Sequence, residues 1–278
     1  MRLLSNLWHS RPFSTMGLPL KSVLDKLQKI APLRLAEPWD NVGLLVQPER
    51  QAQVSTVLLT IDLTEDVVAE AQHVGAQLIV SYHPNIFKPL KSLTQSSWKE
   101  RVVVECIRSN IAVYSPHTSW DAIRGGVNDW LGAALPHSAS RPILPSAERP
   151  DAGAGRLLTL GEALSLRQVL ALVKTHIGLG YLRLGLGRGG SLESQVGTVA
   201  LCAGSGATVL ANVEADLYLT GEMSHHDVLE ATQRGVHVVL CNHSDSERGF
   251  LKVVQPEIAA AGLQVKVSEV DRDCLTTI

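Results

Sequence analysis

Two apolar, β-rich runs within the segment Asp216–Glu247 each end abruptly in polar residues. Glu222 and His225 follow the first run, and His243 and Glu247 follow the second. Imidazole together with carboxylates suits Zn²⁺, Mn²⁺ or Fe²⁺, and one carboxylate can bridge a pair of such ions. The residue types therefore predict a metal site, with Glu222 and His225 as candidate proton carriers.

Glu247 also has a purely structural explanation. Ser244 can begin a helix as its N-cap, with Glu247 at the third helical position, and such a capping box alone would account for the acid. A glutamate in that position also lies four residues after His243 and can face the same ion. The sequence leaves both interpretations open.

The spacing of apolar residues indicates the elements that must position these side chains. The segment Asp216–Glu247 is typical of a strand, a helix at Asp227–Arg234 and a second strand. The two strands are then parallel and bring their carboxyl ends to the same edge of a sheet. In open α/β sheets that edge is where ligands bind.

The same unit occurs earlier in the chain. The stretch Val54–Pro84 aligns with Val196–Glu222 with one short gap, and His117 then falls within one residue of His243. We therefore predict an internal repeat of two related α/β lobes with parallel-rich sheets. Shared strand-helix-strand architecture can produce a similar match without duplication.

The first half supplies its own candidates at the predicted edge. His83 follows a strand expected at Gln77–Ser81, whereas His117 and Asp121 follow a strand expected at Ile111–Tyr114. A lone histidine is more often structural than a ligand, and Asp121 by itself suits a turn. The prediction of a site thus depends on the clustering of these residues at the ends of several strands.

A glycine-rich turn, Gly204-Ser205-Gly206, joins another expected strand to a helix at Thr208–Val213. Backbone N–H groups at the start of a helix can hold a phosphate or a carboxylate. The turn is therefore a candidate anion site that would open onto the same edge as the histidines.

Composition divides the chain into four parts. Residues 1–17, which hold no acid, are expected to be a flexible or targeting N-terminus. Residues 18–135 would form the first α/β lobe, in which Trp39 is expected to anchor the packing. Residues 136–155 contain four prolines and suit a linker, and residues 156–278 would form the second lobe.

Several classes of protein are excluded by composition. The 278 residues are 45% hydrophobic with a net charge of −2, as expected for a soluble globular protein. No basic run suits direct binding of nucleic acid, and no apolar run of ~18 residues suits a membrane span. The four cysteines lack zinc-site spacing and indicate free thiols in a reducing compartment. The expected location is cytoplasmic, with the nucleus or, through residues 1–17, the mitochondrion as alternatives.

Six motifs occur in order between Trp39 and Leu251: WDNVGLLV, SYHPNIF, SPHTSWDAIRGGVN, LCAGSG, DLYLTGEMSHHD and CNHSDSERGFL. Together they resemble the Nif-three-like family, also described as type-two homologues of GTP cyclohydrolase one. The resemblance implies a pair of α/β lobes, assembly into homo-oligomers and a two-metal site in the cleft between the lobes. The family's metal ligands would fall in this sequence on His83, Asp121, His243 and Glu247.

Two features depart from the family pattern. Tyr82 stands where many members have the first histidine of a His-His-Pro motif, and a phenol binds metal poorly because it loses its proton only near a pKa of ~10. The resemblance thus implies one or two divalent ions per chain, of zinc, manganese or iron. Longer relatives also carry an additional domain between the lobes, which the proline-rich linker replaces here.

The resemblance implies two functions of different classes. As a protein-interaction protein or transcriptional co-regulator, the chain would bind transcription-related protein partners without contacting DNA, and the loss of a ligand at Tyr82 favours this. As a metal-dependent hydrolase, it would act on a nucleotide-like substrate. The sequence leaves open whether the chain is an enzyme.

Overall fold

The computed structural model describes residues 17–50 and 52–276. The predicted flexible or targeting segment, residues 1–17, lies outside these residues except for Gly17. Within the described part of the chain, none of the helices has the length and apolar character required to cross a membrane.

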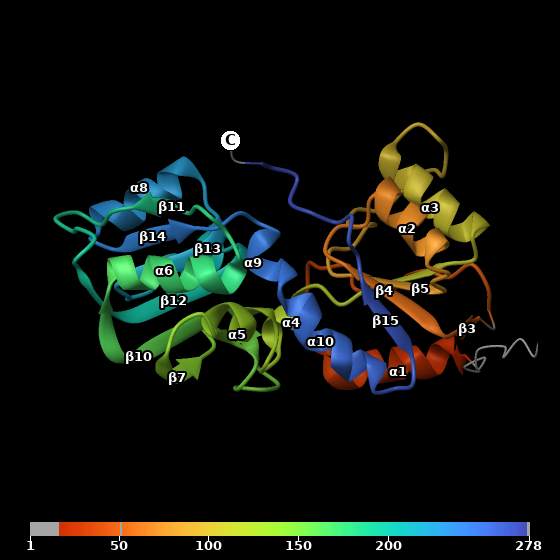
Figure 1. Cartoon of the computed structure of the whole chain (residues 1–278), viewed down its shortest axis with the longest axis horizontal. Coiled ribbons are helices and arrows are strands. Elements are labelled where there is room, and N and C mark those ends of the chain that lie inside the picture. The colour runs from red at the N-terminus through yellow and green to blue at the C-terminus, as the bar shows by residue number, and fades with distance from the viewer. Residues whose placement is uncertain (1–16, 51, 277–278) are drawn as a thin grey trace, which may run out of the picture.

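The first lobe is built on a five-stranded sheet in the order β15-β4-β5-β6-β2 (Figure 1). Four of its strands are parallel, and β2 pairs with β6 in the antiparallel direction. The strands are β2 (Gly43–Val46), β4 (Thr56–Thr60), β5 (Leu78–Ser81), β6 (Ala112–Ser115) and β15 (Gln264–Val267). The three central strands are fully buried, as expected for parallel strands covered on both faces.

Helices cover both faces of this sheet. The face formed by residues such as Leu58 and Ile79 packs on α2 and α3, and the opposite face, with Leu59 and Val80, packs on α1 and α10. These helices are α1 (Leu20–Ile30), α2 (Glu65–His73), α3 (Trp98–Arg108) and α10 (Phe250–Ala259).

The second lobe is built on a six-stranded sheet in the order β11-β14-β13-β12-β10-β7. Its centre, β12 to β14, is parallel, whereas β7, β10 and β11 pair in the antiparallel direction. The strands are β7 (His137–Arg141), β10 (Arg156–Ser165), β11 (Arg183–Gly185), β12 (Gln195–Ser205), β13 (Leu217–Glu222) and β14 (His237–Leu240). The helices around it are α5 (Val127–Gly132), α6 (Leu166–Ile177), α7 (Ala207–Leu210) and α8 (His225–Gln233).

The two lobes share one topology. The order α1, β2, β4, α2, β5, α3, β6 in the first lobe corresponds to α6, β11, β12, α7, β13, α8, β14 in the second, with the same strand pairings. The predicted fold class, two related α/β lobes with parallel-rich sheets, is therefore confirmed. A capping box at Ser165 starts α6.

Each half of the chain contributes elements to the lobe of the other half. After β6 the chain enters the second lobe, where α5 packs on β10 and β12 and where β7 joins the sheet beside β10. After β14 it returns to the first lobe, where α10 packs on β15 and β15 pairs with β4. One apolar core therefore runs through both lobes. This exchange fixes the lobes relative to each other.

The stretch 136–155, expected to be a linker, is structured. It contains β7 and a small antiparallel pair, β8 (Leu144–Pro145) and β9 (Gly153–Ala154). The division into lobes at 18–135 and 156–278 stays a prediction about folding units, since elements from each range pack on the other lobe.

Trp39 does not anchor the packing, and that expectation was wrong. Its side chain is 62% exposed. The turn that carries it directs Asp40 inward instead, and the Asp40 carboxylate is fully buried. A buried acid that accepts hydrogen bonds thus holds this turn, where the sequence suggested an indole.

Candidate metal centre

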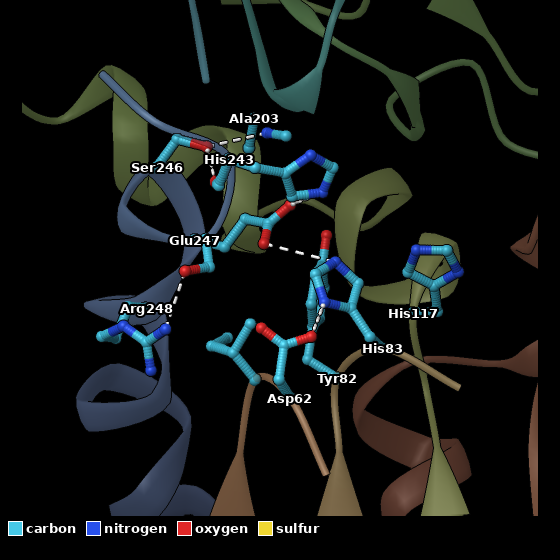
Figure 2. Close-up of polar contacts among 12 residues, drawn as sticks. Asp62, Tyr82, His83, His117, Ala203, His243, Ser246, Glu247 and Arg248 are labelled. Carbon is cyan, nitrogen blue, oxygen red and sulfur yellow. Dashed lines mark hydrogen bonds and ion pairs between the residues drawn. The ribbon is translucent and has the colours of Figure 1, made fainter. Parts of the chain in front are cut away.

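The carboxyl ends of the two sheets meet where the lobes join, and His83, His243 and Glu247 meet there too (Figure 2). His83 follows β5, His243 follows β14, and Glu247 lies on the short helix α9 (Asp245–Arg248). Nε2 of His83 lies 3.4 Å from Oε2 of Glu247, and Nε2 of His243 lies 3.5 Å from Oε1. One ligand atom from each of the three residues lies within 4.8 Å of the others.

A carboxylate orients each of the two imidazoles. Nδ1 of His83 lies 2.9 Å from Asp62, and Nδ1 of His243 lies 2.9 Å from Glu222. With Nδ1–H donating to an acid, each ring keeps the lone pair of Nε2 for a metal ion. Both Nε2 atoms point toward the carboxylate of Glu247. Metal-binding histidines are typically held in this way, with one ring nitrogen bonded to an acid and the other directed at the ion.

The electrostatics of the site require a positive charge. Glu247 is 2% exposed, and its Oε2 has no hydrogen-bond partner among the described residues. Burial alone would lower the pKa of His83, but the negative charges of Glu247 and Asp62 raise it to about 10. Without an ion, a protonated His83 compensates the Glu247 carboxylate, 3.4 Å away. A divalent cation could take over that positive charge once His83 gives up its proton, because metal binding to histidine releases protons, so these residues fit a divalent cation. The triad of His83, His243 and Glu247 could hold a metal ion.

The local backbone is shaped to make room for this cluster. Gly204 at the end of β12 has φ +64°, and a Cβ there would lie 2.5 Å from Oε1 of Glu247 and 3.1 Å from Nε2 of His243. Asn242, which precedes His243, also has a positive φ, of 63°. Asparagine tolerates this region better than most residues. Its backbone turns the chain from β14 into the site.

Asp121, the fourth predicted ligand, lies near the cluster but has a different partner. It is on the short helix α4 (Thr118–Ala122), and its Oδ1 accepts a hydrogen bond of 2.5 Å from the hydroxyl of Tyr82. Burial raises the pKa of Asp121 to about 6 and, with the charge of Asp121, raises the pKa of Tyr82 well above its usual value. A metal-binding role for Asp121 stays a prediction.

A third histidine–carboxylate pair lies beside the cluster. Nδ1 of His117 is 2.8 Å from Asp40, which also accepts a hydrogen bond from the hydroxyl of Thr118. The His117 ring centroid is 5.4 Å from that of His83. His117 has φ 33°, a strained conformation for a residue other than glycine, and such strain persists where the surroundings hold it.

A cavity of about 350 Å³ opens next to the two histidines. Asp62, Arg183 and Glu222 line it, together with residues 273–275 of the C-terminal segment. Glu222, one predicted proton carrier, therefore lies at this cavity. His225, the other, lies in a neighbouring hollow that it shares with Arg183, and its role as a proton carrier stays a prediction.

The Gly204-Ser205-Gly206 turn lies at the site, but part of it is already engaged. The N–H of Gly204 donates to Oγ of Ser246 at 2.8 Å, and α7, which follows the turn, has four residues. In the structure, Gly204 leaves space for Glu247. Binding of an anion by this turn stays a prediction.

The capping box considered for Glu247 is not formed. The hydroxyl of Ser244 makes no cap to α9 and instead bonds to Asp273 at 2.8 Å. Glu247 points into the cluster, as its interpretation as a ligand requires.

Sequence reasoning missed the orienting roles of Asp62 and Asp40. Asp62 lies two residues after the end of β4, at the edge that bears the site, so the reasoning applied to the histidines would have selected it. No sequence spacing links Asp40 to His117, which follows it by 77 residues.

Comparisons with known proteins agree with this fold. The family model Duf34/NIF3 (NGG1p interacting factor 3) matches residues 18–274. NIF3-like protein 1 of Drosophila melanogaster is 47% identical over 266 residues, covering 94% of this chain and 90% of the relative. NGG1-interacting factor 3 of Saccharomyces cerevisiae is 39% identical over 281 residues, covering 92% of this chain and 97% of the relative.

Among solved structures, a Bacillus cereus protein related to NIF3 matches with a TM-score of 0.82 and 22% identity, covering 94% of this chain and 99% of that one. This likeness shows the fold. Fold and site together define a two-lobed α/β protein with a histidine–carboxylate cluster where its lobes join. The chain belongs to the Duf34/NIF3 family.

The position of Gly204 leads to a prediction about stability. Gly75 has nearly the same φ, +66°, and a Cβ added there would have no atom within 4 Å, so it is a matched control. We expect Gly204→Ala and Gly75→Ala each to lose ~1–2 kcal/mol from the left-handed backbone. Gly204→Ala should lose ~1–3 kcal/mol more, because its methyl group displaces Glu247. Urea unfolding measures the loss of stability in each variant. Equal losses in the two variants would contradict the close contact between position 204 and Glu247.

Proposed function

We propose that this chain binds one divalent metal ion through His83, His243 and Glu247 and uses it in a hydrolytic reaction. The observation that carries the proposal is the buried carboxylate of Glu247, which has an unpartnered oxygen among the described residues and lies between two imidazoles. Asp62 and Glu222 hold those imidazoles with Nε2 facing inward. Zinc, manganese or iron suits this set of nitrogen and oxygen donors.

An open site favours catalysis over a structural role. Structural zinc sites are closed by four protein ligands, whereas catalytic sites keep a position for water or substrate. Here three ligands lie beside a cavity. A divalent ion held there supplies Lewis-acid chemistry and activates water toward attack on the substrate.

The chain's own residues supply the other parts of the proposed reaction. Glu222 is 57% exposed and lines the cavity, so it is placed to act as the proton carrier beside the substrate. Burial raises the pKa of Asp62, but the hydrogen bond with His83 lowers it overall, so Asp62 stays ionised and orients that ring. Arg183 on the cavity wall can pair with an anionic group of the substrate. These features support a phosphorylated small molecule, such as a nucleotide, as substrate.

The pairing of Tyr82 with Asp121 supports one ion per chain. The phenol hydroxyl satisfies the Asp121 carboxylate, and Tyr82 is 2% exposed, so the pair is shielded from water. A second ion would need that carboxylate and a ligand in place of the phenol.

A protein-interaction role is the second candidate. The observation that favours it is the name of the Saccharomyces cerevisiae relative, NGG1-interacting factor 3, which implies that the relative contacts a transcription-related protein. We propose that this chain also binds a transcription-related protein and assembles into homo-oligomers. It would then act as a co-regulator in the cytoplasm or the nucleus.

Metal content tests the proposed site. Purified protein analysed by mass spectrometry should contain about one zinc, manganese or iron ion per chain. Glu247→Gln should lose most of it, because the buried charge that demands a cation is gone, whereas Glu193→Gln, at an exposed ion pair, should keep it. Equal metal content in all three proteins would contradict the site.

The role of Tyr82 gives a prediction about stoichiometry. Tyr82→His adds an imidazole beside Asp121 and removes the hydroxyl that occupies its carboxylate, so metal content should rise toward two ions per chain. Tyr82→Phe adds no ligand and should stay near one. If Tyr82→His still contains one ion per chain, Tyr82 does not determine how many ions the site holds.

Turnover separates the two candidate functions. With metal present, the protein should release phosphate from a member of a nucleotide panel. Glu222→Gln should lower turnover ~10²-fold or more, because an amide cannot take up and release a proton as a carboxylate does. The variant should keep its metal, because the amide oxygen still accepts the hydrogen bond from His243. Glu230→Gln, on α8, is the control. If neither the wild-type protein nor a variant turns over any nucleotide, and Glu222→Gln still binds the protein partner as the wild type does, the result would favour the role of a co-regulator.

A further inference from the structure

The C-terminal segment, Ser268–Leu275, runs from β15 back toward the second lobe (Figure 1). Its start is fixed to the first lobe, where Ser268 extends the pairing with β4 and donates a hydrogen bond to Glu70. Its end, residues 273–275, lines the cavity. The segment is therefore part of the wall of the site.

One oxygen atom in this segment contacts both halves of the site. Oδ2 of Asp271 accepts a hydrogen bond of 2.7 Å from the backbone N–H of Ile61 and pairs with Nη1 of Arg248 at 2.6 Å. The Asp271 side chain is 2% exposed. Water therefore competes little for this contact, and burial strengthens it.

The two partners of Asp271 are neighbours of the proposed ligands. Ile61 precedes Asp62, and its carbonyl accepts a hydrogen bond of 3.0 Å from the backbone N–H of His83. Arg248 follows Glu247 on α9 and lies beside it in Figure 2. Asp271 thus joins the backbone that holds His83 to the helix that holds Glu247.

Asp273 adds a second contact from the same segment. Its Oδ2 accepts hydrogen bonds from the backbone N–H and the hydroxyl of Ser244, at 3.2 and 2.8 Å. The Ser244 hydroxyl also accepts a bond of 2.7 Å from Arg248. A helix of four residues has little stability of its own, so α9 depends on such external contacts.

We propose that Asp271 is a positioning residue of the metal centre, holding Glu247 at ligand distance from His83. The proposal rests on the proposed metal binding and adds the C-terminal segment to the residues that the site requires. Groups that orient metal ligands typically change affinity 10- to 100-fold when they are removed, which is about the effect expected here.

Asp216 provides the matched control. Its Oδ2 accepts hydrogen bonds from the backbone N–H groups of Gly197 and Thr198, so it is also a carboxylate that holds backbone. It precedes β13, at the amino end of the sheet, whereas the metal centre lies at the carboxyl end. Its removal should affect stability without affecting the metal.

The experiment is a Co²⁺ titration of the full chain against a competing chelator, with the visible spectrum of the bound ion as a second readout. Asp271→Ala should weaken Co²⁺ binding by ~10- to 100-fold and shift the absorption bands, because Glu247 is no longer held. Asp271→Asn, which keeps the shape and one acceptor oxygen, should lose less. Asp216→Ala should bind Co²⁺ as the wild-type protein does.

The outcomes distinguish the two proposals. Wild-type affinity and spectrum in Asp271→Ala would overturn the positioning role and leave the proposed function intact. An equal loss in Asp216→Ala would also overturn it, since the effect would then follow general stability. A wild-type protein that binds no Co²⁺ would overturn the proposed function together with the positioning role. If Asp271→Ala does not fold, Asp271→Asn decides by the same criteria.

Discussion

The buried carboxylate of Glu247 is the constraint on which the rest of the site depends. An ionised group with 2% exposure and an oxygen unpartnered among the described residues is unstable unless positive charge lies next to it. His83 and His243 face it from the ends of two strands, and Asp62 and Glu222 hold their rings. The arrangement suits a cation because two imidazoles and one carboxylate face the same point, and Asp62 and Glu222 hold the two imidazole rings in that orientation.

The site lies between two lobes, so its geometry depends on how the lobes are held. Each half of the chain gives a helix and a strand to the other lobe, through α5 and β7 in one direction and α10 and β15 in the other. One apolar core then spans the molecule. The buried side chain of Arg156 strengthens this connection, because it donates hydrogen bonds to Asp129 and to the backbone carbonyls of four residues. Ligands from different lobes can keep a fixed spacing on such a frame.

The sequence predicted the parts of the site that follow from local pattern. His83, His243 and Glu247 stand shortly after apolar runs, and parallel strands bring such positions to one edge. Asp271 has no such signal, because its partners lie 210 residues and 23 residues away and no periodicity links them. The expectation for Trp39 was wrong for a related reason: the sequence cannot tell which side chain of a turn points inward. Likewise, no local pattern indicates that β15, from the second half of the chain, pairs with β4 of the first lobe.

The most direct test of the proposed metal centre is the position of the ion. A crystal of the zinc-loaded protein, measured at the zinc absorption edge, should show one anomalous peak between Nε2 of His83, Nε2 of His243 and Glu247. The distances should be ~2.0–2.2 Å to each ligand, with the side chains drawn in from their present spacing. A peak elsewhere, or none at this cluster under saturating zinc, would contradict the central claim.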